Sequence, residues 1–206
     1  MECFLCSPDR ALVYLSSRNF YALLGLGPIV EGYTVVATRS HLPSMMDLPT
    51  QLLNEYTSFM ERVRATLGIW YGPCTVTEHG RVPASDFRSD REGEGHCYHA
   101  HQLIFPVDVD LWPVLCDRFG EDLVRFGAFR DAWAVLEGGL EYLYLEDTMG
   151  GCVVATPRGG FPRRFFRGQV AEALGVRYRA DWREYGGRDL IAAAQKKLLR
   201  KDHGMV

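Results

Sequence analysis

Two histidines separated by a single residue, His99 and His101, are the most chemically suggestive pair in this sequence. They stand in a segment that runs to Pro106 and is typical of a strand, in which successive side chains alternate between faces. Both imidazoles would then project from one face, with Cα atoms about 7 Å apart at the usual strand rise. That spacing suits two separate tasks better than chelation of one metal by both rings. From the residues alone, two histidines that share a face by chance are the alternative.

A Cys-x-x-Cys pair, Cys3 and Cys6, opens the chain. Two thiolates at this spacing can hold one zinc ion from a tight turn, but a structural site needs four ligands. The natural additional ligands are histidines, and His41 and His99 are the candidates. A metal-free thiol pair and a redox pair are the other interpretations of this motif.

The elements that must position these residues alternate between strand and helix patterns. Short apolar runs rich in β-branched residues predict strands over residues 12–15, 20–24, 33–38, 74–78, 97–105, 141–146 and 151–156. Apolar residues at three- and four-residue spacing predict a long helix over 44–68, capped by Asp47, and helices within 107–137, 165–174 and 190–199. This order favours an α+β fold over a doubly wound sheet. We expect a domain over 1–156 and a helical C-terminal extension over 157–206 packed on it.

Composition narrows the class of protein. The 206 residues carry a formal charge of −3, which gives no general attraction to nucleic acid or to an anionic membrane. No apolar segment approaches the ~20 residues that cross a bilayer, and the start of the chain lacks the pattern of a secretory signal. The six cysteines are then expected to be thiols or metal ligands. We predict a cytoplasmic protein with no nucleic-acid or membrane partner.

Three segments together resemble the histidine-triad (HIT) superfamily. They are the run from Leu23 to Pro49, the tripeptide Glu78-His79-Gly80, and His99-Ala100-His101. The superfamily includes nucleotide hydrolases and the galactose-1-phosphate uridylyltransferase branch, and the likeness extends to the zinc-containing members on that side. It implies an antiparallel sheet with packed helices, covers most of the chain, and has its specific motifs in the first 106 residues.

The resemblance also implies roles for the chemical residues. Cys3, Cys6, His41 and His99 match the ligands of a structural zinc ion. His101 matches the family nucleophile, whose ring is oriented by a main-chain carbonyl. A neutral imidazole held in one tautomer can attack phosphorus and form a covalent nucleotidyl intermediate, which water or a second phosphate then resolves. The implied substrate is a nucleotide or nucleoside phosphate, and a homodimer is expected from the resemblance alone.

One position departs from the family pattern. Triad members usually carry histidine two residues beyond the nucleophile, and the uridylyltransferase branch carries glutamine, but this chain has Leu103. Loss of one preorganised donor could cost on the order of 10²–10³ in rate. His79, Arg81, His96 and Gln102 are the candidate substrate-binding residues, although Gln102 should face the other side of the strand.

Three functions follow from these patterns. The first is an enzyme that cleaves or transfers a nucleoside phosphoryl group at the α-phosphate through His101. The second, motivated by Leu103, is a nucleotide-binding or regulatory protein that has lost the chemistry. The third is a divergent zinc-containing biosynthetic enzyme with an open metal position. A slipped register with Cys97, His99 and His101 as the triad would make His99 the nucleophile, but the position of Pro106 favours His101.

Overall fold

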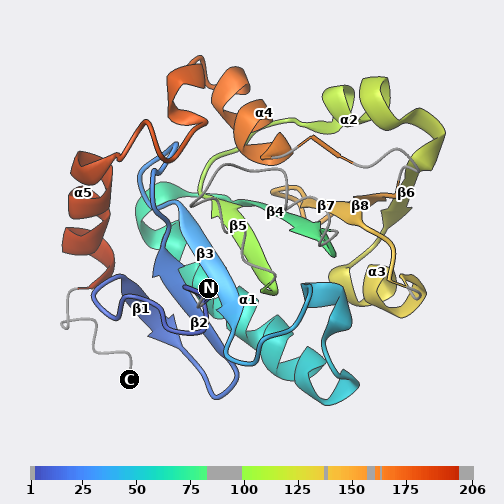
Figure 1. The fold of residues 1–206 in the computed structure, drawn as a ribbon, viewed down its shortest axis with the longest axis horizontal. Coiled ribbons are helices and arrows are strands. Elements are labelled where there is room, and N and C mark those ends of the chain that lie inside the picture. The colour runs from blue at the N-terminus through green and yellow to red at the C-terminus, as the bar shows by residue number, and fades with distance from the viewer. Residues whose placement is uncertain (1–2, 83–98, 137–138, 157–160, 163, 200–206) are drawn as a thin grey trace.

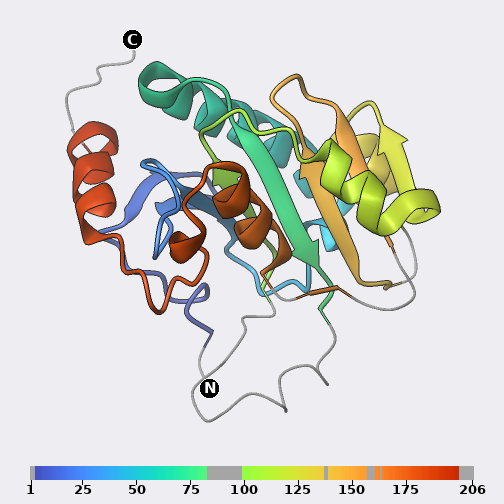
Figure 2. The ribbon, with the colours of Figure 1, turned by 90° about the horizontal axis from the view of Figure 1, so that it is seen from above.

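Eight strands form one sheet in the computed structural model, and α-helices cover both of its faces (Figures 1 and 2). The structure describes the chain except for residues 1–2, 83–98, 137–138, 157–160, 163 and 200–206. Every neighbouring pair of strands is antiparallel, which confirms the α+β fold. In spatial order the strands are β1 (Val13–Ser16), β2 (Phe20–Leu24), β3 (Thr34–Thr38), β5 (His101–Phe105), β4 (Thr75–Gly80), β7 (Tyr142–Glu146), β8 (Cys152–Ala155) and β6 (Leu123–Phe126).

Seven of these strands lie where the apolar runs predict them, with two differences. β5 begins at His101, so His99 precedes the strand; residues 97–98 of the predicted run lie outside the described residues. Before the strand, the amide of Ala100 donates to the carbonyl of Leu42, while its carbonyl accepts from the amide of Thr38. β6 lies in a segment where only helices were predicted. The strand forms by pairing with β8, which lies far along the chain, and local sequence does not indicate that pairing.

The long predicted helix is interrupted at its start. Two 3-10 turns, η1 (Met45–Asp47) and η2 (Thr50–Leu52), precede α1 (Leu53–Tyr71). A residue before proline avoids the helical region, and Leu48, before Pro49, accordingly has an extended ψ of 130°.

The predicted cap and end of this helix are also corrected. Asp47 does not cap α1; its carboxylate accepts hydrogen bonds from Ser44 and Arg81. The helix continues through Gly68 and stops at Gly72, whose φ of +90° suits glycine.

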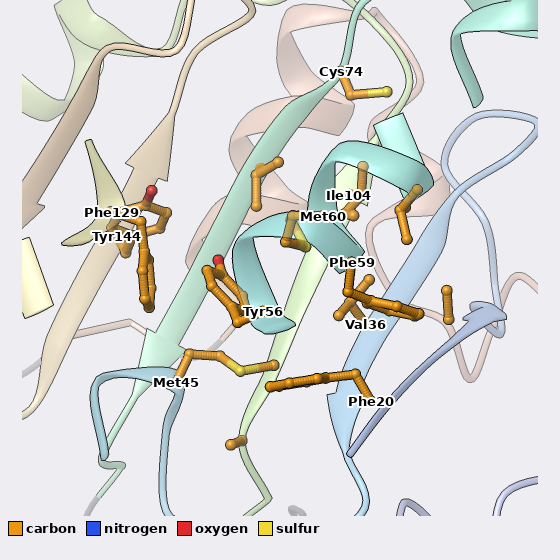
Figure 3. Packing of buried hydrophobic residues seen from close by; sticks show 14 of the residues in the cluster. Phe20, Val36, Met45, Tyr56, Phe59, Met60, Cys74, Ile104, Phe129 and Tyr144 are labelled. Atoms are coloured by element: carbon orange, nitrogen blue, oxygen red, sulfur yellow. The ribbon is translucent and has the colours of Figure 1, made fainter. Parts of the chain in front are cut away.

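α1 covers one face of the sheet with an apolar stripe. Phe59 and Met60 of this helix pack on Phe20 and Val36 of the strands, and Tyr56 lies beside them (Figure 3). The other helices on this face are α3 (Phe129–Val135) and α5 (Arg188–Leu198), which contribute Ala132, Ala194 and Leu198 to the same cluster.

The opposite face carries a second apolar cluster. It is covered by α2 (Trp112–Phe119) and α4 (Phe165–Ala173), whose buried residues pack on β7 and β8. The two C-terminal helices therefore contact opposite faces of the sheet, while the division into a domain and an extension stays a prediction. Among the described residues no helix is both long and apolar enough to cross a membrane.

Candidate active site and metal centre

A cavity of about 540 Å³ opens on the sheet face that carries α4. Its floor is formed by alternate residues of three neighbouring strands, and its walls by the N-terminal segment and the start of α4. Most of the lining is apolar. The floor residues are Val35 of β3, Thr77 and His79 of β4, and His101 and Leu103 of β5.

His101 is fixed in a single tautomer. Its Nδ1 atom lies 2.7 Å from the main-chain oxygen of His99. A carbonyl oxygen can only accept, so Nδ1 carries the proton and Nε2 carries the lone pair. This is the orientation that a nucleophilic imidazole requires.

His99 is fixed in the opposite tautomer. Its Nε2 atom donates to the carbonyl oxygen of Thr38 at 2.6 Å, so the lone pair is on Nδ1. Nδ1 lies 3.5 Å from the sulfur atoms of both Cys3 and Cys6. Burial lowers the pKa of His99, and the neutral ring that results is the form that binds metal. The two histidines therefore carry their lone pairs on different ring nitrogens.

The four predicted metal ligands come together. The donor atoms of Cys3, Cys6, His41 and His99 all lie within 4.8 Å of one another, and Nδ1 of His41 is 3.2 Å from the sulfur of Cys6. A tetrahedral zinc ion with Zn–S of about 2.3 Å and Zn–N of about 2.0 Å would separate sulfur and nitrogen by about 3.5 Å. The observed separations fit that geometry. Cys3 is disulfide-bonded in this structure, so zinc ligation by this residue requires reduction.

Leu103 and Thr77 lie opposite each other in the cavity floor. They are register partners in the β4–β5 ladder and therefore project from the same face. Leu103 offers no polar atom. The Thr77 hydroxyl is fully buried and has no hydrogen-bond partner within the described part of the chain. Leu103 thus places an apolar side chain beside a hydroxyl that has no partner among the described residues.

His79 lines the cavity, as its prediction as a substrate-binding residue requires. Its Nε2 atom lies 2.6 Å from the Oε1 atom of Glu141, and its ring meets Phe161 edge-on at 5.4 Å. Glu141 is the residue just before β7. No local pattern in the sequence indicates this partnership.

Two other predicted substrate contacts, Arg81 and Gln102, are not among the residues that line the cavity. The guanidinium of Arg81 donates to the carboxylate of Asp47 and to the carbonyl of Leu136. Gln102 is fully buried on the α1 face of β5, because adjacent strand residues point to opposite sides. His96 lies outside the described residues.

A saturated polar network occupies the α1 face of the same strands. The Oε1 atom of Gln102 accepts from the hydroxyl of Tyr56 at 2.8 Å, and Glu78 accepts from the amide of Met45 at 2.8 Å. Burial raises the pKa of the Glu78 carboxyl to about 8. These groups are satisfied by one another and support the strands from behind.

The C-terminal segment brings cations to the cavity wall. Arg164 and Arg167 line it, although Arg167 is buried and donates to the carbonyls of Gly27 and Ala180. Arg164 lies 2.5 Å from Asp181, whose pKa is lowered by the amide of Arg183 and then by Arg164 itself. The sequence shows these arginines but does not reveal that they line the same cavity as His101.

Comparisons with known proteins find similarity only among solved structures. No family model and no curated protein matches the sequence. Among solved structures, the C. elegans NitFhit protein aligns at TM-score 0.40 and 16% identity over 50% of this chain and 23% of its own. A HIT family hydrolase from Legionella pneumophila aligns with the same TM-score and identity, over 54% of this chain and 98% of its own. A Zn-bound histidine triad family protein from Mycobacterium smegmatis also aligns at TM-score 0.40 and 16% identity, over 54% of this chain and 78% of its own.

Proposed function

We propose that this chain is a histidine-triad protein that cleaves or transfers a nucleoside phosphoryl group at the α-phosphate through a covalent intermediate on His101. The observation that carries the proposal is the hydrogen bond from Nδ1 of His101 to the carbonyl of His99. It leaves the Nε2 lone pair as the nucleophile at the floor of the cavity. A volume of about 540 Å³ is in the range of small-molecule sites.

The proposed reaction has two displacements. Nε2 of His101 attacks phosphorus, a P–N bond forms, and the bond between phosphorus and the leaving group breaks. The ring gains positive charge, and the carbonyl of His99 stabilises it through the proton on Nδ1. An acceptor oxygen then attacks phosphorus and releases the histidine. Water as acceptor gives hydrolysis, and a second phosphate gives transfer.

Zinc would act as a structural ion in this scheme. Cys3, Cys6, His41 and His99 would hold it, and four protein donors fill a tetrahedral site, which argues against an open catalytic metal. The ion would stabilise the N-terminal turn and the segment that carries the His99 carbonyl. It would thereby support the orientation of His101 indirectly. A reducing compartment such as the cytoplasm would supply the thiolates.

Metal analysis of the reduced protein tests this centre. We expect one zinc per chain in the wild type and a loss of zinc in Cys6→Ser. The matched control is Cys116→Ser, because Cys116 is a free thiol outside the cluster and its variant should keep the metal. Equal zinc contents in the two variants would contradict the assignment.

Turnover tests the proposed function. Wild type and His101→Ala are compared on a panel of dinucleoside polyphosphates, nucleoside phosphoramidates and nucleotide sugars, with products separated by chromatography. We expect the variant to lose on the order of 10³ or more in kcat on each substrate that the wild type accepts. Normal turnover by His101→Ala would refute a nucleophilic role.

Leu103 favours a second candidate, a nucleotide-binding protein without turnover. The apolar side chain gives the phosphate no hydrogen bond at the third triad position. This candidate predicts that nucleotides bind with measurable heat in calorimetry while no member of the panel is consumed. Any His101-dependent product would exclude it.

A further inference from the structure

The cavity floor holds a second imidazole beside the nucleophile. Thr77 of β4 and Leu103 of β5 are register partners in antiparallel strands. His79 is two residues beyond Thr77, and His101 is two residues before Leu103, so both histidines lie at the same end of neighbouring strands and on the same face. Both line the cavity. A group bound at phosphorus beside His101 would therefore lie near His79.

Glu141 gives the His79 ring a defined orientation. The carboxylate can only accept a hydrogen bond, so Nε2 of His79 carries a proton and donates to Oε1 of Glu141, 2.6 Å away. The ring of Phe161 packs against the imidazole. Both partners are largely shielded, with 20% of the His79 side chain and 13% of the Glu141 side chain exposed. The hydrogen bond to the carboxylate and the edge-on contact with Phe161 together hold the imidazole in place.

The floor beside these rings also offers an unused hydroxyl. Thr77 is buried, and its Oγ1 atom has no partner in the part of the chain that the structure describes. Buried polar atoms are nearly always hydrogen-bonded, so this one points to a polar group of a ligand. Opposite Leu103, the neighbouring strand β4 thus supplies the polar side chains of Thr77 and His79.

We propose that His79, oriented by Glu141, is the general acid that protonates the leaving group, a task for which Leu103 has no suitable atom. This inference rests on the proposed function of His101. The remaining ring nitrogen, Nδ1, is the proton donor, and it has no hydrogen-bond partner among the described residues. Glu141 is the positioning residue for this step.

The proton and the electron pairs balance over the two displacements. As Nε2 of His101 forms its bond to phosphorus, the departing oxygen takes the P–O bonding pair and the proton from His79. His79 is then neutral. In the second displacement it accepts a proton from the attacking water while the P–N bond breaks, which returns both histidines to their starting states.

A pair of substrates that differ only in the leaving group tests the proposal. Nucleoside 5′-(p-nitrophenyl) phosphates release an anion that needs no proton, and nucleoside 5′-phenyl phosphates release a more basic one. We expect His79→Gln to lose roughly 10²- to 10⁴-fold in kcat on the phenyl esters and less than about tenfold on the p-nitrophenyl esters. Glu141→Gln should also lower the ratio of the kcat on phenyl esters to the kcat on p-nitrophenyl esters, by a smaller factor than His79→Gln. The nucleoside panel comprises adenosine, guanosine, cytidine and uridine.

A matched control and a rescue complete the design. Glu146→Gln changes the carboxylate at the other end of β7, which bonds Arg64 and Tyr144, and should leave the ratio of the two rates unchanged. Leu103→His in the His79→Gln background should restore part of the phenyl-ester rate. Activity on the p-nitrophenyl esters reports that each variant is folded.

The outcomes separate this inference from the function on which it rests. Equal losses on both esters in His79→Gln, with a wild-type ratio in Glu141→Gln, would overturn the role of His79 and leave the nucleophile His101 in place. Failure of the wild type to turn over either ester or to form a His101 adduct would refute the proposed function, and the role of His79 with it.

Discussion

The two faces of β4 and β5 use alternate residues of the same strands in opposite ways. On the α1 face, Glu78, Gln102 and Tyr56 are buried and bonded to one another or to the main chain. On the cavity face, His101 presents a lone pair, and Thr77 has a hydroxyl without a partner among the described residues. Strand alternation alone separates the two sets.

This difference distinguishes structural polar residues from chemical ones. A buried network whose donors and acceptors are satisfied stabilises the sheet and has no capacity left for a ligand. A polar atom without such a partner, as the Thr77 hydroxyl is among the described residues, can bind one. Substitutions on the α1 face should therefore change stability, whereas substitutions on the cavity face should change kinetics.

The largest expected effect on the α1 face is the pH dependence from Glu78. Its pKa is about 8 in the folded protein and near 4.5 when unfolded. The folded state therefore holds a proton that the unfolded state releases between these values. The free energy of unfolding should fall by on the order of 1.4 kcal/mol per pH unit as pH rises through this window.

Denaturant titrations at pH 5.5 and pH 7.5 measure this slope. Glu78→Gln stays neutral at both pH values and should flatten the dependence relative to wild type. A slope that is the same in wild type and variant would show that Glu78 is ionised in the fold.

A smaller effect is expected from Tyr56→Phe. The change leaves the buried Oε1 atom of Gln102 without the hydroxyl that now donates to it, and should cost about 1–3 kcal/mol of stability. Because Tyr56 does not line the cavity, kcat/KM on any accepted substrate should stay at its wild-type value. Thermal melts and steady-state kinetics measure the two quantities. A large kinetic loss with normal stability would break the division between the faces.

The smallest effect sharpens the comparison within one strand. Thr77→Val removes a hydroxyl that has no partner in the described part of the chain. The change should preserve stability while raising KM roughly fivefold, the equivalent of one hydrogen bond of about 1 kcal/mol. Thr75→Val is the control, because its hydroxyl donates to the carbonyl of Val107 at 2.9 Å. That variant should lose about 1 kcal/mol of stability with unchanged KM. The reverse pattern would contradict a ligand-binding role for Thr77.

Much of the site was predictable from local sequence. The fold class follows from the strand and helix patterns, and the cluster of Cys3, Cys6, His41 and His99 follows from residue type together with family resemblance. Strand alternation also places Gln102 on the other face from His101. These predictions depend on spacings within a few residues or on a shared motif.

The rest depends on contacts between distant segments. Glu141 meets His79 across 62 positions, because β4 pairs with β7, and no spacing rule indicates that pairing. Arg81 has the residue type of a phosphate ligand, but the turn that contains Asp47 sequesters its guanidinium. Arg164 reaches the cavity only because α4 packs on the sheet. Such placements require the tertiary structure.

The central claim is that His101 becomes covalently attached to phosphorus, and intact-mass spectrometry tests it most directly. Reduced, zinc-loaded protein is mixed with the nucleoside 5′-(p-nitrophenyl) phosphates and quenched under alkaline conditions, which preserve a phosphoramidate bond. The account predicts a mass increase of one nucleoside monophosphoryl group, located on His101 by fragmentation and absent in His101→Ala. Turnover of these esters without any adduct, or an adduct on His99 instead, would contradict it.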